Sequence, residues 1–180
     1  MAGFLRRRDK HERPAFQLYG SAVAAARAPY LYAALGVPDT LDGRFDLVGL
    51  YVCLVIRRLR TMPPPGAAVA QAVFDAMFLD MDTNLRELGV GDQTIARNVR
   101  AMWEAFHGRA TAYELPLTDC DPAALAEAIQ RNVWRGAEAP GAASLARVAL
   151  GQMAVLQASA PSDLLAGHAT FASPLTLLAA

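Results

Sequence analysis

The chain has 180 residues, of which 54% are hydrophobic and 19% charged, so one domain with a substantial buried core is expected. This composition excludes a mostly disordered chain. The 17 basic and 17 acidic side chains leave no net charge, which argues against a dedicated nucleic-acid-binding protein.

Residues 1–13 alternate in charge without apolar periodicity, and we expect them to form a flexible N-terminal arm. Residues 1–60 contain 10 basic and 5 acidic side chains, a net +5 that residues 61–180 offset. The candidates for contact with an anionic membrane or ribosome surface are Arg6, Arg7, Arg8, Lys10 and Arg13, and the alternative is a solvated tail. No apolar stretch follows these charges, so no secretory signal is expected.

An all-helical domain is predicted over residues 14–167, with a partly ordered tail over 168–180. Pro14 suits the first turn of a helix over 14–28, and Pro29 then precedes a short helix over 30–35. The apolar run 45–60 predicts a buried helix, with a buried strand as the alternative because its middle is rich in valine. No stretch is long and apolar enough to predict a membrane span.

After a proline-rich break, large apolar residues recur at helical spacing over 67–88 and again over 92–113. The first row predicts a packing seam made by Phe74, Phe78, Met81, Leu85 and Leu88. Because the connection is short, we expect an antiparallel hairpin at the centre of a fold of about six to seven helices, with Asp92 capping the second helix.

The rest of the chain predicts a loop over 115–117, helices over 122–136 and 144–160, one short turn ending at Leu165, and an irregular tail. Cys53 lies in the apolar run and Cys120 in a polar loop. Two cysteines so placed predict free thiols in a reducing compartment.

Side chains suited to catalysis are sparse. The three histidines lie in separate segments without metal-ligand spacing. Asp75, Asp80 and Asp82 form the one carboxylate cluster, and a Mg²⁺-dependent helical enzyme acting on an isoprenoid or other lipid is one alternative function. Asp80 and Asp82 diverge by about 200° on a helix, however, and Asp82 can pair with Arg86.

A helical transcription regulator is a further alternative. The two short helices after the arm are compatible with a helix-turn-helix arrangement. They lack a basic recognition helix, so we expect no sequence-specific DNA binding. No phosphate-binding glycine loop, nucleophile elbow or C-x-x-C motif is present either.

The stretch 74–92, which contains Phe74–Asp75–Ala76–Met77–Phe78–Leu79–Asp80–Met81–Asp82, resembles the central motif of the ubiquinol–cytochrome c chaperone family. Three further segments agree in order: Leu35–Gly36–Val37–Pro38–Asp39–Thr40, then Asp42–Gly43–Arg44–Phe45–Asp46, then Gly108–Arg109 with Tyr113. The resemblance covers about residues 16–115 and is looser beyond them.

This resemblance implies an all-helical, non-enzymatic assembly factor for the cytochrome bc complex, without catalytic residues, metal or cofactor. Mitochondrial members act on newly made cytochrome b near the ribosome and inner membrane, together with a small partner subunit. By similarity, this chain is expected to be a bacterial counterpart in the cytoplasm, peripheral to the inner face of the inner membrane.

A chaperone for apolar helices needs an exposed apolar groove with a polar rim. The sequence offers Met77, Leu79, Trp103 and Tyr51 for its apolar part, with a place in the core or on the ordinary surface as the alternative for each. The rim candidates are the charged residues of the resembling motifs: Asp42, Arg44, Asp80, Asp82, Arg86, Glu87, Asp92 and Arg109. The alternative role for these charges is to cap helices and to pair with one another.

Overall fold

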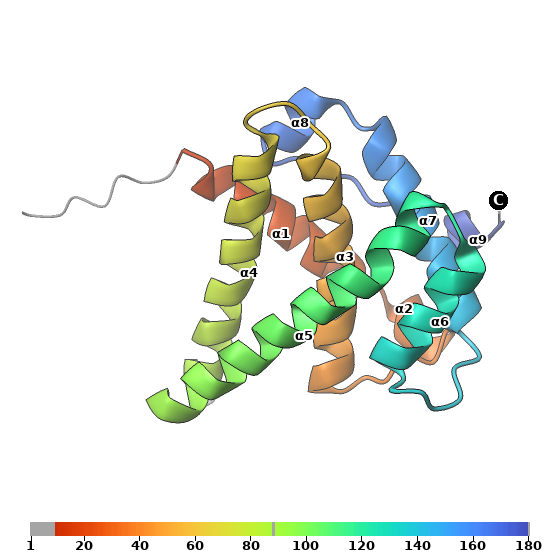
Figure 1. The fold of residues 1–180 in the computed structure, drawn as a ribbon, viewed down its shortest axis with the longest axis horizontal. Coiled ribbons are helices and arrows are strands. Elements are labelled where there is room, and N and C mark those ends of the chain that lie inside the picture. Colours follow the sequence, from red (N-terminus) through yellow and green to blue (C-terminus); the bar gives the residue numbers. More distant parts are fainter. Residues whose placement is uncertain (1–9, 88, 180) are drawn as a thin grey trace, which may run out of the picture.

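In the computed structural model, residues 10–87 and 89–179 are described, and within them the chain forms nine α-helices and no strand (Figure 1). The expected all-helical fold is confirmed. Three helices have only five or six residues, which accounts for the higher count. The helices are α1 Glu12–Ala26, α2 Pro29–Ala33, α3 Leu41–Arg60, α4 Gly66–Glu87, α5 Asp92–Thr118, α6 Pro122–Val133, α7 Ala142–Ala158, α8 Pro161–Leu165 and α9 Pro174–Ala179.

Helix α3 is the centre of the core and contacts α1, α4, α5, α6 and α7. It begins where the Thr40 hydroxyl accepts a hydrogen bond from the Gly43 backbone N–H at 3.1 Å. Every residue from Asp46 to Val55 is buried. The helix is therefore apolar on all sides because other helices surround it, which confirms the helical interpretation over the strand.

Helix α4 buries a different face from the one expected. Val69, Val73 and Met77, spaced four residues apart, are fully buried. The predicted row beginning with Phe74 and Phe78 is only half-buried, and its last residue lies outside the described part of the chain. Smaller side chains take the inward position where α4 packs on α1 and α3, and the aromatic row turns toward α5.

Helices α4 and α5 form the expected hairpin, but Figure 1 shows them diverging from their linked ends, with α5 crossing α3. Two local predictions were wrong. The segment 115–117 is helical despite Pro116, because Tyr113 and Leu117 bury the last turn of α5 in the core. Asp92 is the first residue inside α5, and the N-cap is Gly91.

The C-terminal segment is more regular than expected up to residue 179. The buried Gln152 side chain on α7 donates a hydrogen bond to the Ala172 carbonyl at 2.8 Å and accepts one from its N–H at 3.0 Å. Phe171 packs edge-on against Tyr51, and α9 lies against α7. Among the described helices, none combines the length and apolar character needed to cross a membrane.

Candidate functional site

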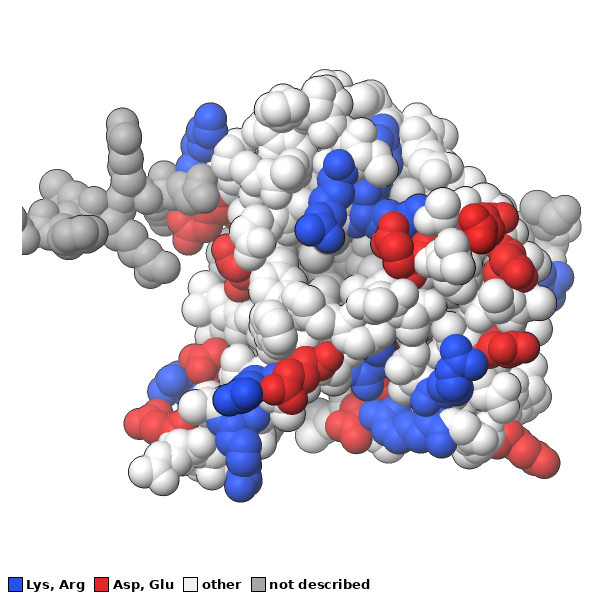
Figure 2. All heavy atoms as spheres, viewed as in Figure 1, with Lys and Arg blue, Asp and Glu red and all other residues white. Residues whose placement is uncertain are grey.

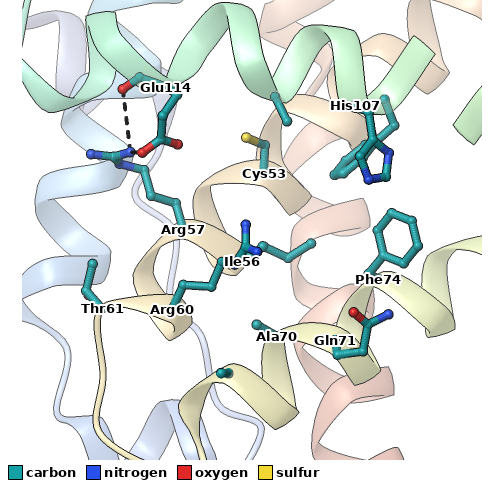
Figure 3. A pocket seen from close by; sticks show the side chains of 13 residues that line it. Cys53, Ile56, Arg57, Arg60, Thr61, Ala70, Gln71, Phe74, His107 and Glu114 are labelled. Carbon is teal, nitrogen blue, oxygen red and sulfur yellow. Dashed lines mark hydrogen bonds and ion pairs between the residues drawn. The ribbon is translucent and has the colours of Figure 1, made fainter. Parts of the chain in front are cut away.

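A cavity of about 410 Å³ opens between α3, α4 and α5, where the hairpin diverges (Figure 3). Each helix contributes residues that recur at helical spacing and therefore share one face. The lining residues are Cys53, Ile56, Arg57, Arg60 and Thr61 from α3 and its end, Ala67, Ala70, Gln71 and Phe74 from α4, and Phe106, His107, Ala110 and Glu114 from α5. On the face in Figure 2, the middle is largely uncharged and hollowed, and charged side chains border it.

The cavity stays open because small residues face it from two sides. Ala67 and Ala70 on α4 and Ala110 on α5 leave space that larger side chains would fill. One wall is aromatic: the Phe74 ring lies 5.5 Å from that of Phe106 in an edge-on arrangement. These features give a partly apolar hollow.

The aromatic wall continues to the molecular surface. Trp103 stacks on His107 with ring centroids 3.9 Å apart, and Trp103 is 46% exposed. Leu79 on α4 is also exposed. Trp103 and Leu79 are thus accessible, which a groove residue must be. Met77 and Tyr51, the other two groove candidates, are fully buried and so belong to the core, their alternative place: Met77 faces α1 and α3, and Tyr51 faces the C-terminal segment.

The cavity mouth carries charge on its α3 side. Arg57 pairs with Glu114 and donates a hydrogen bond to the Thr118 hydroxyl at 2.9 Å. Figure 3 shows Arg60 extending into the space between the helices, and no described residue pairs with it. Burial raises the pKa of the Cys53 thiol to about 12, so this lining group remains a neutral thiol.

A second charged cluster lies inside the fold. The fully buried Asp46 carboxylate contacts Arg109 of α5 at 2.5 Å and Arg135, after α6, at 2.8 Å. Arg135 also lies 3.4 Å from Asp42, and the Arg109 guanidinium stands over the Phe45 ring. Burial raises the pKa of the Asp46 carboxyl, and the two guanidinium groups oppose that shift. The cluster ties α3, α5 and the end of α6 together.

The other predicted rim residues are spread over the surface and do not line the cavity. Arg44 pairs with Asp39 at 2.6 Å. Asp80 accepts a hydrogen bond from Tyr19 at 2.6 Å, which links α4 to α1. Arg86 pairs with Asp82 and Asp92, so the expected Asp82–Arg86 pair is confirmed. Glu87 is exposed at the end of α4.

The aspartates of α4 do not converge. Asp75 accepts a hydrogen bond from Gln71, while Asp80 and Asp82 have the separate partners Tyr19 and Arg86. Within the described residues, no three histidine, cysteine or acidic side chains are placed to hold a metal ion. Asp75 and Asp82 thus pair within α4 itself, and of these three contacts only Tyr19–Asp80 joins two helices.

Of the expected anionic-surface residues, Lys10 and Arg13 are exposed at the start of α1. Arg6, Arg7 and Arg8 lie outside the described residues. Three residues that line the cavity were not among the predicted site residues: Arg57, Arg60 and Glu114. The signal available for the two arginines was their spacing of three residues, on the face of α3 that also presents Ile56.

The comparisons with known proteins agree with one another. A family model described as ubiquinol-cytochrome C chaperone matches residues 33–171. The crystal structure of the Cbp3 homolog from Brucella abortus is similar with a TM-score of 0.81 and 33% identity, covering 91% of each chain.

A curated relative in Xenopus laevis, ubiquinol-cytochrome-c reductase complex assembly factor 1, is 23% identical over 119 residues. The match covers 66% of this chain and 59% of the relative, so the chain spans about three fifths of that relative's length. Because the family model matches well over half of the chain and the solved relative shares the fold across nearly its whole length, this chain belongs to the ubiquinol–cytochrome c chaperone family.

Proposed function

We propose that the chain is a non-enzymatic assembly chaperone that holds newly made cytochrome b during biogenesis of ubiquinol–cytochrome c reductase. The observation that carries the proposal is the partly apolar cavity between α3, α4 and α5, on a chain of this family. A hollow with an exposed aromatic edge fits the side chains of a client helix awaiting its partners. The lipid-enzyme alternative loses support because its three aspartates have separate partners.

Replacing Ala110 by leucine should reduce cytochrome b recovery by at least about fivefold, because the added side chain occupies the cavity. The measurement is a pull-down of the tagged chain from solubilised membranes after translation is halted. The recovered cytochrome b is quantified in the form that has not joined its partner subunits.

Thr111→Leu is the matched control, since Thr111 is exposed and does not line the cavity. It should leave recovery unchanged, and both variants should melt near the wild-type temperature. Equal recovery with Ala110→Leu and wild type would remove the cavity as the client site. Failure of the wild type to recover cytochrome b would overturn the proposed function itself.

We also propose that the chain works at the cytoplasmic face of the inner membrane, close to the ribosome, through its basic N-terminal residues. Anionic lipid contributes about 1 kcal/mol per nearby Lys or Arg. Changing Arg6, Arg7, Arg8, Lys10 and Arg13 together to glutamine should therefore weaken binding to anionic phospholipid vesicles by tenfold or more, measured by co-sedimentation.

The controls for this vesicle experiment are neutral phosphatidylcholine vesicles, which should bind neither protein, and Arg147→Gln, an exposed change on α7. The attraction should fall with added salt because exposed charges are screened. Unchanged sedimentation of the five-residue variant would remove the arm from the proposal.

A further inference from the structure

We infer that the cavity selects an apolar helical segment that carries one carboxylate, and that this carboxylate binds Arg60. The inference rests on the proposed function and specifies the chemistry of the client segment. It follows from three observations: the charge state of the cavity mouth, the partners of the arginines at the end of α3, and the size of the cavity.

The last turn of α3 carries three arginines, and two of them are engaged. Arg57 contacts Glu114 and Thr118, and Arg58 donates a hydrogen bond to the Leu156 carbonyl at 3.1 Å. Arg60 lines the cavity, and in the described part of the chain it has no anionic or hydrogen-bonding partner. It is therefore a cation at the edge of a partly apolar space and is available to a ligand.

The charges around the cavity do not balance. Its lining contains two arginines but a single acidic residue, Glu114, which is already paired with Arg57. One further carboxylate would neutralise the excess positive charge at the cavity mouth. The Arg57–Glu114 pair shows that a carboxylate can be accommodated at this edge of the cavity. The Glu114 side chain is 63% exposed, while the Arg57 side chain that it pairs with is only 16% exposed.

The remaining lining fits apolar side chains. The cavity of about 410 Å³ is bordered by Ile56, Phe74, Phe106 and three alanines. A helix presents side chains at i, i+3 and i+4, so one helix face can place apolar groups in the hollow and an acidic group beside Arg60.

This chemistry is what an unassembled membrane helix presents. An acidic side chain within a membrane segment is costly when unpaired and normally has a partner on a neighbouring helix. Before that neighbour arrives, the carboxylate needs another cation. A groove that offers both an apolar wall and Arg60 meets both needs.

The test uses a labelled, leucine- and alanine-rich helical peptide with one central glutamate, and a second peptide with glutamine in its place. Fluorescence anisotropy measures their binding to the full chain. We expect the glutamate peptide to bind wild type about five- to tenfold more tightly than the glutamine peptide. Arg60→Gln should abolish that preference.

Glu114→Gln should have the opposite effect and strengthen binding of the glutamate peptide, because it releases Arg57 as a second cation. Arg147→Gln on α7 removes the same charge away from the cavity and should change neither peptide's binding. Arg60→Gln should weaken binding of the glutamate peptide and Glu114→Gln should strengthen it. Unfolding does not explain such opposite changes in affinity, because it would weaken binding in both variants.

Equal binding of the two peptides to wild type, or a preference that survives in Arg60→Gln, would overturn the inference. The cavity could still hold cytochrome b, and the Ala110→Leu pull-down decides that independently. If neither peptide binds while cytochrome b is recovered, the inference fails and the proposed function stands.

Discussion

Replacing Asp46 by asparagine should lower the free energy of unfolding by about 3–5 kcal/mol, because it leaves buried positive charge without a counter-charge. Asp46 is fully buried, and its two oxygens face Arg109 and Arg135 at 2.5 and 2.8 Å. The Arg109 side chain is only 13% exposed, so water cannot replace the lost carboxylate. A loss of this size is a large fraction of the stability of an ordinary domain.

Urea unfolding followed by circular dichroism measures this loss as a shift in midpoint at constant slope. The control is Asp39→Asn, which removes the exposed partner of Arg44 and should leave the midpoint nearly unchanged. The double variant Asp46→Asn with Arg109→Met should recover part of the loss, since it removes both a charge and its buried partner. A midpoint shift no larger than that of Asp39→Asn would show that the cluster does not hold α3 to α5.

The local architecture could be predicted from sequence because its signals are local. The proline and glycine breaks separate the helices, Thr40 and Asp121 cap them, and the Asp82–Arg86 pair follows from a spacing of four residues. The inward face of α4 could not be predicted in this way. Its sequence has apolar residues on two faces, and only the positions of α1, α3 and α5 decide which is buried.

Other features could not be predicted from the sequence because they depend on long-range contacts. Asp46, Arg109 and Arg135 are distant in sequence, and no periodicity relates a carboxylate on one helix to guanidinium groups on others. Arg109 and Asp42 were therefore predicted as rim residues although they belong to the cluster around Asp46. Helix 92–113 was ended too early because Pro116 is a helix breaker in isolation, while burial of Leu117 favours the extra turn.

The candidate cavity was missed because it arises from an angle between helices. A sequence that predicts a hairpin predicts close packing along its length, whereas α4 and α5 diverge over α3. Arg57 and Arg60 lie in the last turn of α3, where cations suit the negative end of the helix dipole. That role is compatible with their position, but their orientation toward the cavity depends on the tertiary structure.

Replacing Gly141 by alanine should destabilise the protein by about 2–3 kcal/mol, because the new methyl group has no space. A Cβ at this position would lie 1.9 Å from the Leu35 carbonyl oxygen and 2.7 Å from its carbon, both backbone atoms. The φ of Gly141 is −85°, a value open to any residue, so the effect comes from packing alone. The nearby Trp134 indole donates a hydrogen bond to the Gly36 carbonyl at 3.0 Å, which fixes the same backbone segment.

In a chain of this length the expected loss corresponds to a fall of about 4–12 °C in melting temperature. Gly20→Ala is the matched control: no atom lies within 4 Å of its added Cβ, and alanine favours the helix by roughly 0.5–1 kcal/mol, so melting should rise slightly. Equal melting of the two variants would mean that the loop before α7 moves freely away from Leu35. Because Gly141 lies outside the α3–α4–α5 cavity, its alanine variant should still bind the glutamate peptide below its melting temperature, which separates the stability of the fold from the chemistry of the groove.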